Sequence, residues 1–347
     1  LPGDFISVIM KRRDFAKNVG LGILATQSLS SYAATKLFAD QNAKVPIGLC
    51  NHSLRSMRLN AEQFIAYATI QKLDSILLNT FQPFESLEES YLIKLKDKAQ
   101  DAGISIYMTE GIRVATLVGS PIVGVRIGAI DDRYLDGGIE AHLEAVIKVM
   151  KTSRSQALDA GIKFAFENHA GDLRSDELLT LINETGTDIC GALFDPANAV
   201  WALEDPMVAL KKLGSTIICT SVRDIQVWET DEGATFQGMA IGEGILDFQQ
   251  YAKTMADLCP GVPLHVETIS NSARTIPFLN PEFWEGFPNL KAKGLVDFLR
   301  MVKKGSPQEI IDPPKGMNQK EFDIELQQKE LLKSFEYLRM NCHVGLK

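Results

Sequence analysis

The sequence lacks both paired cysteines and an excess of positive charge. Its five cysteines are scattered over 347 residues with no C-x-x-C pair, which matches neither a disulfide framework nor a zinc site. Lys and Arg number 36 against 44 Asp and Glu, for a net charge of -8. Because an acidic chain repels phosphate backbones, no nucleic-acid partner is expected. No apolar run is long enough for a membrane span, which needs ~20 residues.

The N-terminal segment has the pattern of an export signal. From Met10 the chain reads MKRRDFAKNVGLGILATQSLSSYAA, with Arg12 and Arg13 ahead of a weakly apolar stretch and small residues. This resembles a twin-arginine signal, whose pattern is R-R-x-F followed by a modest apolar segment. We therefore expect residues 1–33 to be a signal region that starts at Met10, and the protein to be exported to the periplasm. The alternative is a basic amphipathic first helix that stays on the chain.

Short apolar runs alternate with amphipathic stretches along the rest of the chain. Eight runs have the character of buried strands, at residues 45–50, 75–80, 104–109, 122–130, 162–167, 190–195, 216–222 and 263–268. Continuous apolar strands that alternate with helices indicate an α/β fold with a parallel sheet. Eight such units fit a closed (β/α)8 TIM barrel of ~250 residues. An open doubly wound sheet is the alternative, but the first turn, GLCNHSLR, is not the G-x-G-x-x-G of such folds.

Neither an internal repeat nor a low-complexity linker divides the chain into further domains. We expect the barrel to occupy residues 34–306. A proline break then leads into a charged helical pattern, DPPKGMNQKEFDIELQQKELLKSFEYLRM. Residues 307–347 are therefore predicted to form a C-terminal helical extension. It would pack on the outside of the barrel or contact a second subunit in a homo-oligomer.

Carboxylates close three of the predicted strands. Glu167, Asp195 and Glu267 end the fifth, sixth and eighth apolar runs, and chemistry in such barrels is placed at that end of the strands. Burying three carboxylates around one axis costs free energy unless a cation neutralises them. Their oxygens suit a hard divalent ion such as Mn²⁺ or Mg²⁺, or Co²⁺.

Other polar residues near the strand ends are candidates for substrate binding. Guanidinium groups can bind an anion or polarise a carbonyl, whereas a loop imidazole is equally well explained by hydrogen bonding within the protein. His265 lies two residues before Glu267 on the same strand face, so it is expected to be a packed core histidine. The substrate-binding candidates are His52, Arg126, His169, Asn198, Arg223 and Asp224.

Five segments resemble the motifs of the xylose-isomerase-like barrel superfamily of sugar isomerases and epimerases. They are FENHAGD, LFDPANAVWALEDP, SVRD, GEGILDF and HVETIS. The resemblance implies a divalent metal held by Glu, Asp, His and Glu, and Glu167, Asp195 and Glu267 match three of these positions. At the histidine of the usual H-x-K-D or H-x-R-D motif this chain has Ser221. Asn198 stands where several epimerases of the superfamily carry a histidine.

The resemblance implies a metal-dependent sugar isomerase or epimerase that transfers a proton through an enediolate. Glu167 and Glu267 would be both metal ligands and acid–base catalysts. Since export argues against a phosphorylated cytoplasmic substrate, a free or oxidised sugar is expected. One alternative is a metal-dependent lyase or hydrolase that acts on keto-sugar glycosides. Another is a sugar-binding barrel that has lost catalysis, for which Ser221 is the warning sign.

Overall fold

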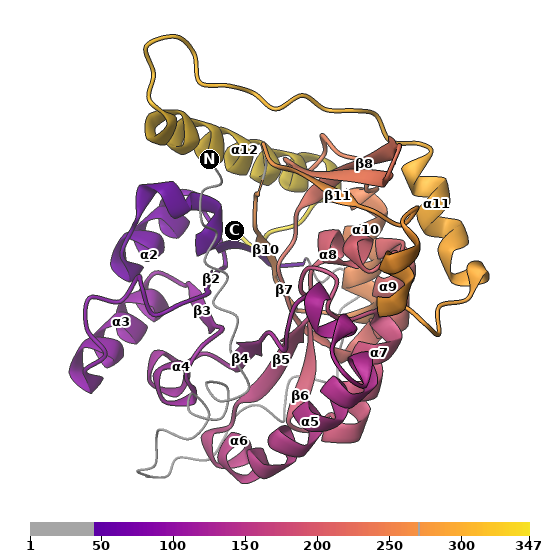
Figure 1. Ribbon diagram of the computed structural model, residues 1–347. Coiled ribbons are helices and arrows are strands. Elements are labelled where there is room, and N and C mark those ends of the chain that lie inside the picture. Colours follow the sequence, from indigo (N-terminus) through magenta and orange to yellow (C-terminus); the bar gives the residue numbers. More distant parts are fainter. Residues whose placement is uncertain (1–44, 270) are drawn as a thin grey trace.

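A parallel eight-stranded barrel forms the centre of the computed structural model, which describes residues 45–269 and 271–347 (Figure 1). The strands follow the order β10-β1-β2-β3-β4-β5-β6-β7, and a parallel bridge between Val222 and Val266 joins the two ends. Each strand lies within one of the eight predicted runs, so the TIM barrel is confirmed. The strands are β1 (Ile47–Cys50), β2 (Ser75–Leu78), β3 (Ser105–Met108), β4 (Ile122–Val125), β5 (Lys163–Glu167), β6 (Cys190–Phe194), β7 (Ile217–Thr220) and β10 (Leu264–Val266).

Burial on both faces explains the continuous apolar runs. Every residue of β1, β2, β6 and β10 is buried, because helices cover the outside of the barrel and side chains fill its inside. Within β1, Leu49 belongs to the large core that the helices share, whereas Cys50 belongs to a small cluster with Leu77, Ala165 and other strand residues. Alternate residues therefore face the helices and the barrel interior.

Helices alternate with the strands and pack around them (Figure 1). A capping box begins the first of them: Asn60 Oδ1 accepts from the Gln63 amide at 2.8 Å, and Gln63 Oε1 accepts from the Asn60 amide at 2.9 Å. The helices are α2 (Ala61–Ile70), α3 (Glu89–Asp101), α4 (Ile112–Val118), α5 (Gly138–Thr152), α6 (Arg154–Ala160), α7 (Ser175–Thr185), α8 (Pro196–Trp201), α9 (Pro206–Leu213) and α10 (Phe248–Leu258). Short 3₁₀ turns are η1 (Asn51–Met57), η2 (Ile130–Tyr134), η3 (Gly214–Thr216), η4 (Pro281–Gly286) and η5 (Ala292–Leu295).

A three-stranded antiparallel sheet, which the sequence did not lead us to expect, lies beside the barrel. It has the order β11-β9-β8, with β8 (Asp224–Thr230), β9 (Gly233–Met239) and β11 (Ala273–Ile276). Its apolar side chains pack with those of α11 (Val296–Val302) in a second hydrophobic core. Two of the strands follow β7 directly and the third follows β10, so this sheet extends the segments that leave the candidate site.

The C-terminal extension is confirmed as a helix, α12 (Gln319–Cys342), and it packs on the protein itself. Its Gln327 accepts from the Ser56 amide at 3.1 Å and donates to the Ser56 hydroxyl at 2.9 Å. Further along, Ser334 Oγ accepts from the Ile241 amide at 2.9 Å. The helix therefore lies against η1, the turn that leaves β1 at the mouth of the barrel (Figure 1).

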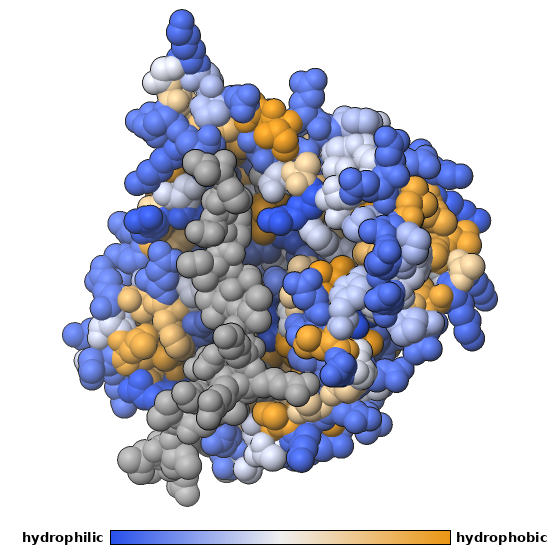
Figure 2. Space-filling model, in the orientation of Figure 1, coloured by the Kyte–Doolittle hydropathy of each residue, from blue (hydrophilic) through white to orange (hydrophobic). Residues whose placement is uncertain are grey.

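The predictions about export and assembly are not tested by the fold. The signal region predicted for residues 1–33 lies outside the described residues. Within the described ranges, no helix combines the length and apolar character needed to cross a membrane. The face drawn in Figure 2 is mainly hydrophilic, with small hydrophobic groups between the charged side chains. The homo-oligomer stays a prediction.

Candidate active site

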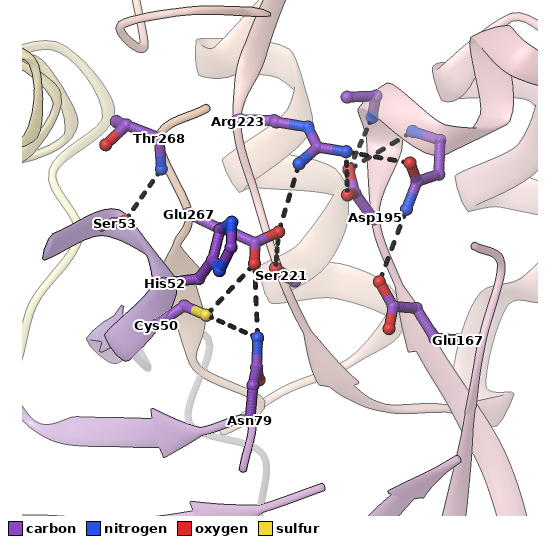
Figure 3. A network of polar contacts seen from close by, with 12 residues as sticks. Cys50, His52, Ser53, Asn79, Glu167, Asp195, Ser221, Arg223, Glu267 and Thr268 are labelled. Atoms are coloured by element: carbon purple, nitrogen blue, oxygen red, sulfur yellow. Dashed lines mark hydrogen bonds and ion pairs between the residues drawn. The ribbon is translucent and has the colours of Figure 1, made fainter. Parts of the chain in front are cut away.

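The carboxyl ends of the strands bring four predicted site residues together (Figure 3). Glu167 is the last residue of β5, Asp195 follows β6 directly, and Ser221 follows β7. Glu267 follows β10. Because parallel strands end at the same edge of a barrel, these side chains converge at its mouth. The abrupt change from apolar to polar residues at each strand end is thus what builds the site.

The guanidinium of Arg223 lies between two of the carboxylates (Figure 3). Its Nη2 is 2.9 Å from Asp195 Oδ2, and its Nη1 is 3.2 Å from Glu267 Oε2. Nη2 also donates to Asn198 Oδ1 at 2.9 Å. Only 7% of Arg223 is exposed. Burial disfavours its charge, but Asp195, Glu267 and Glu167 outweigh burial and raise the pKa of Arg223 above its ordinary value. Arg223 is therefore a buried cation held by protein oxygens, and its contact with a substrate stays a prediction.

Glu267 is surrounded by hydrogen-bond donors. Its Oε2 accepts from Ser221 Oγ at 2.9 Å and pairs with Arg223. Its Oε1 accepts from Cys50 Sγ at 3.4 Å and from Asn79 Nδ2 at 3.3 Å. Burial alone would raise the pKa of Glu267, but the positive charge of Arg223 and the hydrogen bonds lower it to about 2. Glu267 is thus ionised and a weak base at neutral pH.

Glu167 has a different environment from Glu267. One of its oxygens accepts from Asn198 Nδ2 at 3.4 Å, and the other lies 3.9 Å from Arg126 Nε. Its side chain is 14% exposed, and that of Arg126 is 49% exposed. Burial raises the pKa of Glu167 to about 7, against the opposing charge of Arg126 and with the help of the negative charge of Glu267. Glu167 can therefore gain and lose a proton near neutral pH.

The two candidate imidazoles are neutral. Burial lowers the pKa of His52 to about 4 and that of His169 to about 4. His169 Nδ1 lies 3.4 Å from the carbonyl oxygen of Gly128, which can only accept, so this nitrogen carries the proton. His52 lies beside Glu267 in Figure 3. Both side chains are partly exposed, so they stay candidates for contact with a substrate, as does Arg126.

Asp224 binds backbone amides within the protein. It is fully buried, and its two oxygens accept four backbone N–H groups at 2.8 to 3.1 Å, those of Ile225, Gly242, Gly244 and Leu246. A Cβ at Gly244 would lie 2.2 Å from Asp224 Oδ1, so glycine allows this close approach. The carboxylate fixes the loop between β9 and α10. These contacts occupy both oxygens of Asp224, and its contact with a substrate stays a prediction.

Two residues of the network were missed by sequence reasoning. Cys50 and Asn79 contact each other at 3.1 Å as well as Glu267. Cys50 is the last residue of β1 and Asn79 follows β2, so their place at strand ends was the available signal. The prediction for His265 is confirmed, because it is fully buried and bonded on both ring nitrogens, to Ser75 and Thr220 at 3.0 Å each.

The donor set does not fit a divalent ion as it is arranged. Among residues 45–269 and 271–347, no group of three or more His, Cys, Asp or Glu side chains is placed to hold a metal. The carboxylates of Asp195 and Glu267 instead face the cationic Arg223, which would repel a second cation between them. Ser221 donates its hydroxyl hydrogen toward Glu267. In this arrangement the two carboxylates are paired with Arg223, and a bound Mn²⁺, Mg²⁺ or Co²⁺ stays a prediction.

Comparison with known proteins adds a family and one distant relative. Residues 66–300 match the family described as xylose isomerase-like TIM barrel. The uncharacterized protein YihM of Escherichia coli strain K12 is 25% identical over 168 residues, which cover 47% of this chain and 51% of YihM. The chain thus spans about half the length of the curated relative that it matches.

Solved structures of low sequence identity share the fold. A D-psicose 3-epimerase has a TM-score of 0.54 at 11% identity, over 86% of this chain and 99% of its own. The IOLI protein, solved with a zinc atom, has a TM-score of 0.54 at 13% identity, over 85% of this chain and 100% of its own. The probable 3-DHS dehydratase AsbF of Bacillus anthracis has a TM-score of 0.51 at 12% identity, over 64% of this chain and 92% of its own. Since the family match covers well over half of the sequence, this chain belongs to the xylose isomerase-like TIM barrel family.

Proposed function

We propose that this protein is a sugar isomerase or epimerase that moves a proton on a free or oxidised sugar. The observation that carries the proposal is the pair of unlike glutamates at the barrel mouth. The pKa of Glu167 is raised to about 7 and that of Glu267 is lowered to about 2. Glu167 is therefore suited to exchange a proton at neutral pH, which is the task of a general base.

The proposed step transfers a proton from carbon to Glu167. The Glu167 carboxylate takes a proton from the carbon next to the sugar's carbonyl group. The C–H electron pair forms a C=C bond and the carbonyl π pair moves onto oxygen, which gives an enediolate. Arg126, whose Nε lies 3.9 Å from Glu167 Oε2 and whose side chain is 49% exposed, supplies positive charge for that oxygen. The hydroxyl on the deprotonated carbon gives its proton to the former carbonyl oxygen, so the negative charge moves to the neighbouring oxygen. That oxygen re-forms a C=O bond, and the C=C electron pair takes the proton back from Glu167 at the former carbonyl carbon.

The unequal glutamates favour isomerisation over epimerisation. An epimerase removes a proton from one face of a carbon and delivers one to the other face, so it needs a second group of suitable pKa. Glu267 is ionised and held by Ser221 and Arg223, so we assign it to positioning rather than to proton transfer. One base on one face is sufficient to move a proton between adjacent carbons.

A sugar-binding barrel without catalysis is the second candidate. The observation in its favour is Ser221, at the position where the resemblance leads us to expect histidine. A lyase would share the first proton transfer but expel a substituent from the enediolate. The three functions differ in their products, so one experiment distinguishes them.

The test is NMR of free and 3-keto sugars incubated with the protein in deuterated water. We expect deuterium at a sugar carbon together with an isomeric product, and loss of both in Glu167→Gln. Glu184→Gln is the matched control, because Glu184 lies on the nearby helix α7 and is exposed to solvent. An unsaturated product would indicate a lyase. Sugar binding with no deuterium uptake would indicate the non-catalytic barrel and would refute the proposal.

A further inference from the structure

The positive charge that lies between Asp195 and Glu267 belongs to a side chain of the protein, that of Arg223. We infer that the guanidinium of Arg223 occupies the place where a divalent ion was predicted, and that this barrel works as a metal-free site. The inference concerns the charge of the site and depends on the proposed function only for its catalytic consequence. It is carried by the contacts of Arg223, by Ser221, and by the burial of the carboxylates.

Asp195 divides its two oxygens between the backbone and Arg223. Its Oδ1 accepts from the amides of Ala197 at 2.8 Å and Asn198 at 3.4 Å, at the start of α8. Its Oδ2 faces the protein interior, 2.9 Å from Arg223 Nη2. An uncompensated buried carboxylate costs several kcal/mol. The charge of Arg223 offsets part of that cost at the oxygen that the backbone leaves open, although burial still raises the pKa of Asp195 to about 7.

Arg223 is held from two sides of the mouth. Nη2 contacts Asp195 and Asn198, which follow β6, and Nη1 contacts Glu267, which follows β10, at 3.2 Å. The planar fork of an arginine suits such spaced oxygens, and its charge is permanent in proteins. One cation thus links two strand ends that would otherwise repel each other through their carboxylates.

The residue at position 221 is also unsuited to bind a metal ion. A histidine here would present a nitrogen lone pair to an ion, whereas Ser221 donates a hydrogen bond to Glu267 at 2.9 Å. Serine therefore satisfies the carboxylate directly and leaves no nitrogen ligand. The hydrogen-bond donor at position 221 and the guanidinium between the two carboxylates both disfavour a bound metal ion.

The arrangement has a consequence for substrate binding. Arg223 Nε is buried, and within the described residues it has no hydrogen-bond partner. This N–H is an unpaired donor inside the site, which a sugar oxygen would reach only after a shift of the side chains that cover it. A fixed guanidinium next to the reacting group can stabilise a developing negative charge without an ion, as the proposed isomerisation requires.

The decisive experiment replaces Arg223 and Ser221 and measures whether the site then binds a metal ion. Tag-free protein is titrated with Co²⁺, followed by its d–d absorption, and with Mn²⁺, followed by electron paramagnetic resonance. We expect no one-site binding by the wild type or by Ser221→His, because Arg223 remains in both. The double variant Ser221→His with Arg223→Met should bind one ion, since it gains a nitrogen ligand and loses the competing cation.

The controls connect any binding to this site. Adding Asp195→Asn to the double variant should abolish binding, and Co²⁺ should raise the melting temperature of the double variant but not of the wild type. One-equivalent binding by the wild type that Asp195→Asn removes would overturn the inference, even if the double variant fails to fold. A folded double variant that binds no ion would overturn it as well. None of these readouts uses turnover, so they stand whether or not the isomerase proposal is correct.

Discussion

Ser221 and Glu267 are joined by a hydrogen bond of 2.9 Å that links the ends of β7 and β10. The hydroxyl donates to Oε2, the same oxygen that pairs with Arg223. A donor of this kind stabilises the ionised form of a buried carboxylate. Serine at this position therefore helps to keep Glu267 ionised without a metal ion, and Glu267 in turn pairs with Arg223.

Ser221→Ala should destabilise the protein at pH 7 by about 1–3 kcal/mol, since a buried charge loses a donor. The pKa of Glu267 is about 2 in the folded protein, below its ordinary value, so its contribution to stability is present at neutral pH. That contribution disappears as pH falls through the folded pKa. The difference between wild type and Ser221→Ala in urea unfolding should therefore shrink in acid. Exposed Ser306→Ala is the control, and a pH-independent difference would contradict the prediction.

Glu167→Gln should lower deuterium exchange at the sugar carbon by about 100-fold or more, the usual contribution of a general base. Binding of the sugar, measured by calorimetry, should change much less, because the amide keeps the shape of the side chain. Glu167→Asp should retain part of the exchange. A Glu167→Gln variant that exchanges at the wild-type rate would mean that another group removes the proton.

Much of the barrel could be predicted from sequence because its signal is local. Each strand is a continuous apolar run, and carboxylates at three run ends indicated where the site lies. The antiparallel sheet was missed because β8, DIQVWET, begins within the SVRD motif and mixes polar with apolar residues, so it does not stand out as a continuous apolar run. The roles of Arg223 and Asp224 depend on contacts with residues far along the chain, such as Glu267 for Arg223 and Gly244 for Asp224. No local pattern reports such contacts.

Asp224→Asn should destabilise the protein by about 2–5 kcal/mol, because an amide nitrogen cannot accept the backbone N–H groups that one carboxylate oxygen now binds. The structure gives Asp224 four such donors. Thermal unfolding measures the effect, with exposed Asp297→Asn as the matched control. Sugar affinity of the folded fraction should be unchanged. A weaker affinity with an unchanged melting temperature would return Asp224 to the substrate site.

Changing Arg12 and Arg13 together to lysine should keep the full-length chain inside the cell, if the segment from Met10 is a twin-arginine signal. The lysines preserve the positive charge, so a merely basic helix would tolerate the change. Fractionation followed by N-terminal sequencing measures the outcome. Normal export of the lysine variant would refute the signal, and so would a mature protein that still begins at Met10.

Arg126→Gln should move the acidic limb of the pH–rate profile to higher pH. Burial raises the pKa of Glu167 to about 7 and the positive charge of Arg126 opposes that rise, so removing the charge should raise the pKa further. Exchange requires the ionised base, hence activity falls as pH decreases through this pKa. Measured at saturating sugar over a series of pH values, the limb should shift upward and the plateau should fall, because Arg126 also stabilises the enediolate in our proposal. Arg126→Lys should restore the position of the limb more than the plateau, since lysine keeps the charge but lacks the planar fork of arginine. If the acidic limb of Arg126→Gln stays in place, Arg126 does not affect the pKa of Glu167, and burial alone sets that pKa.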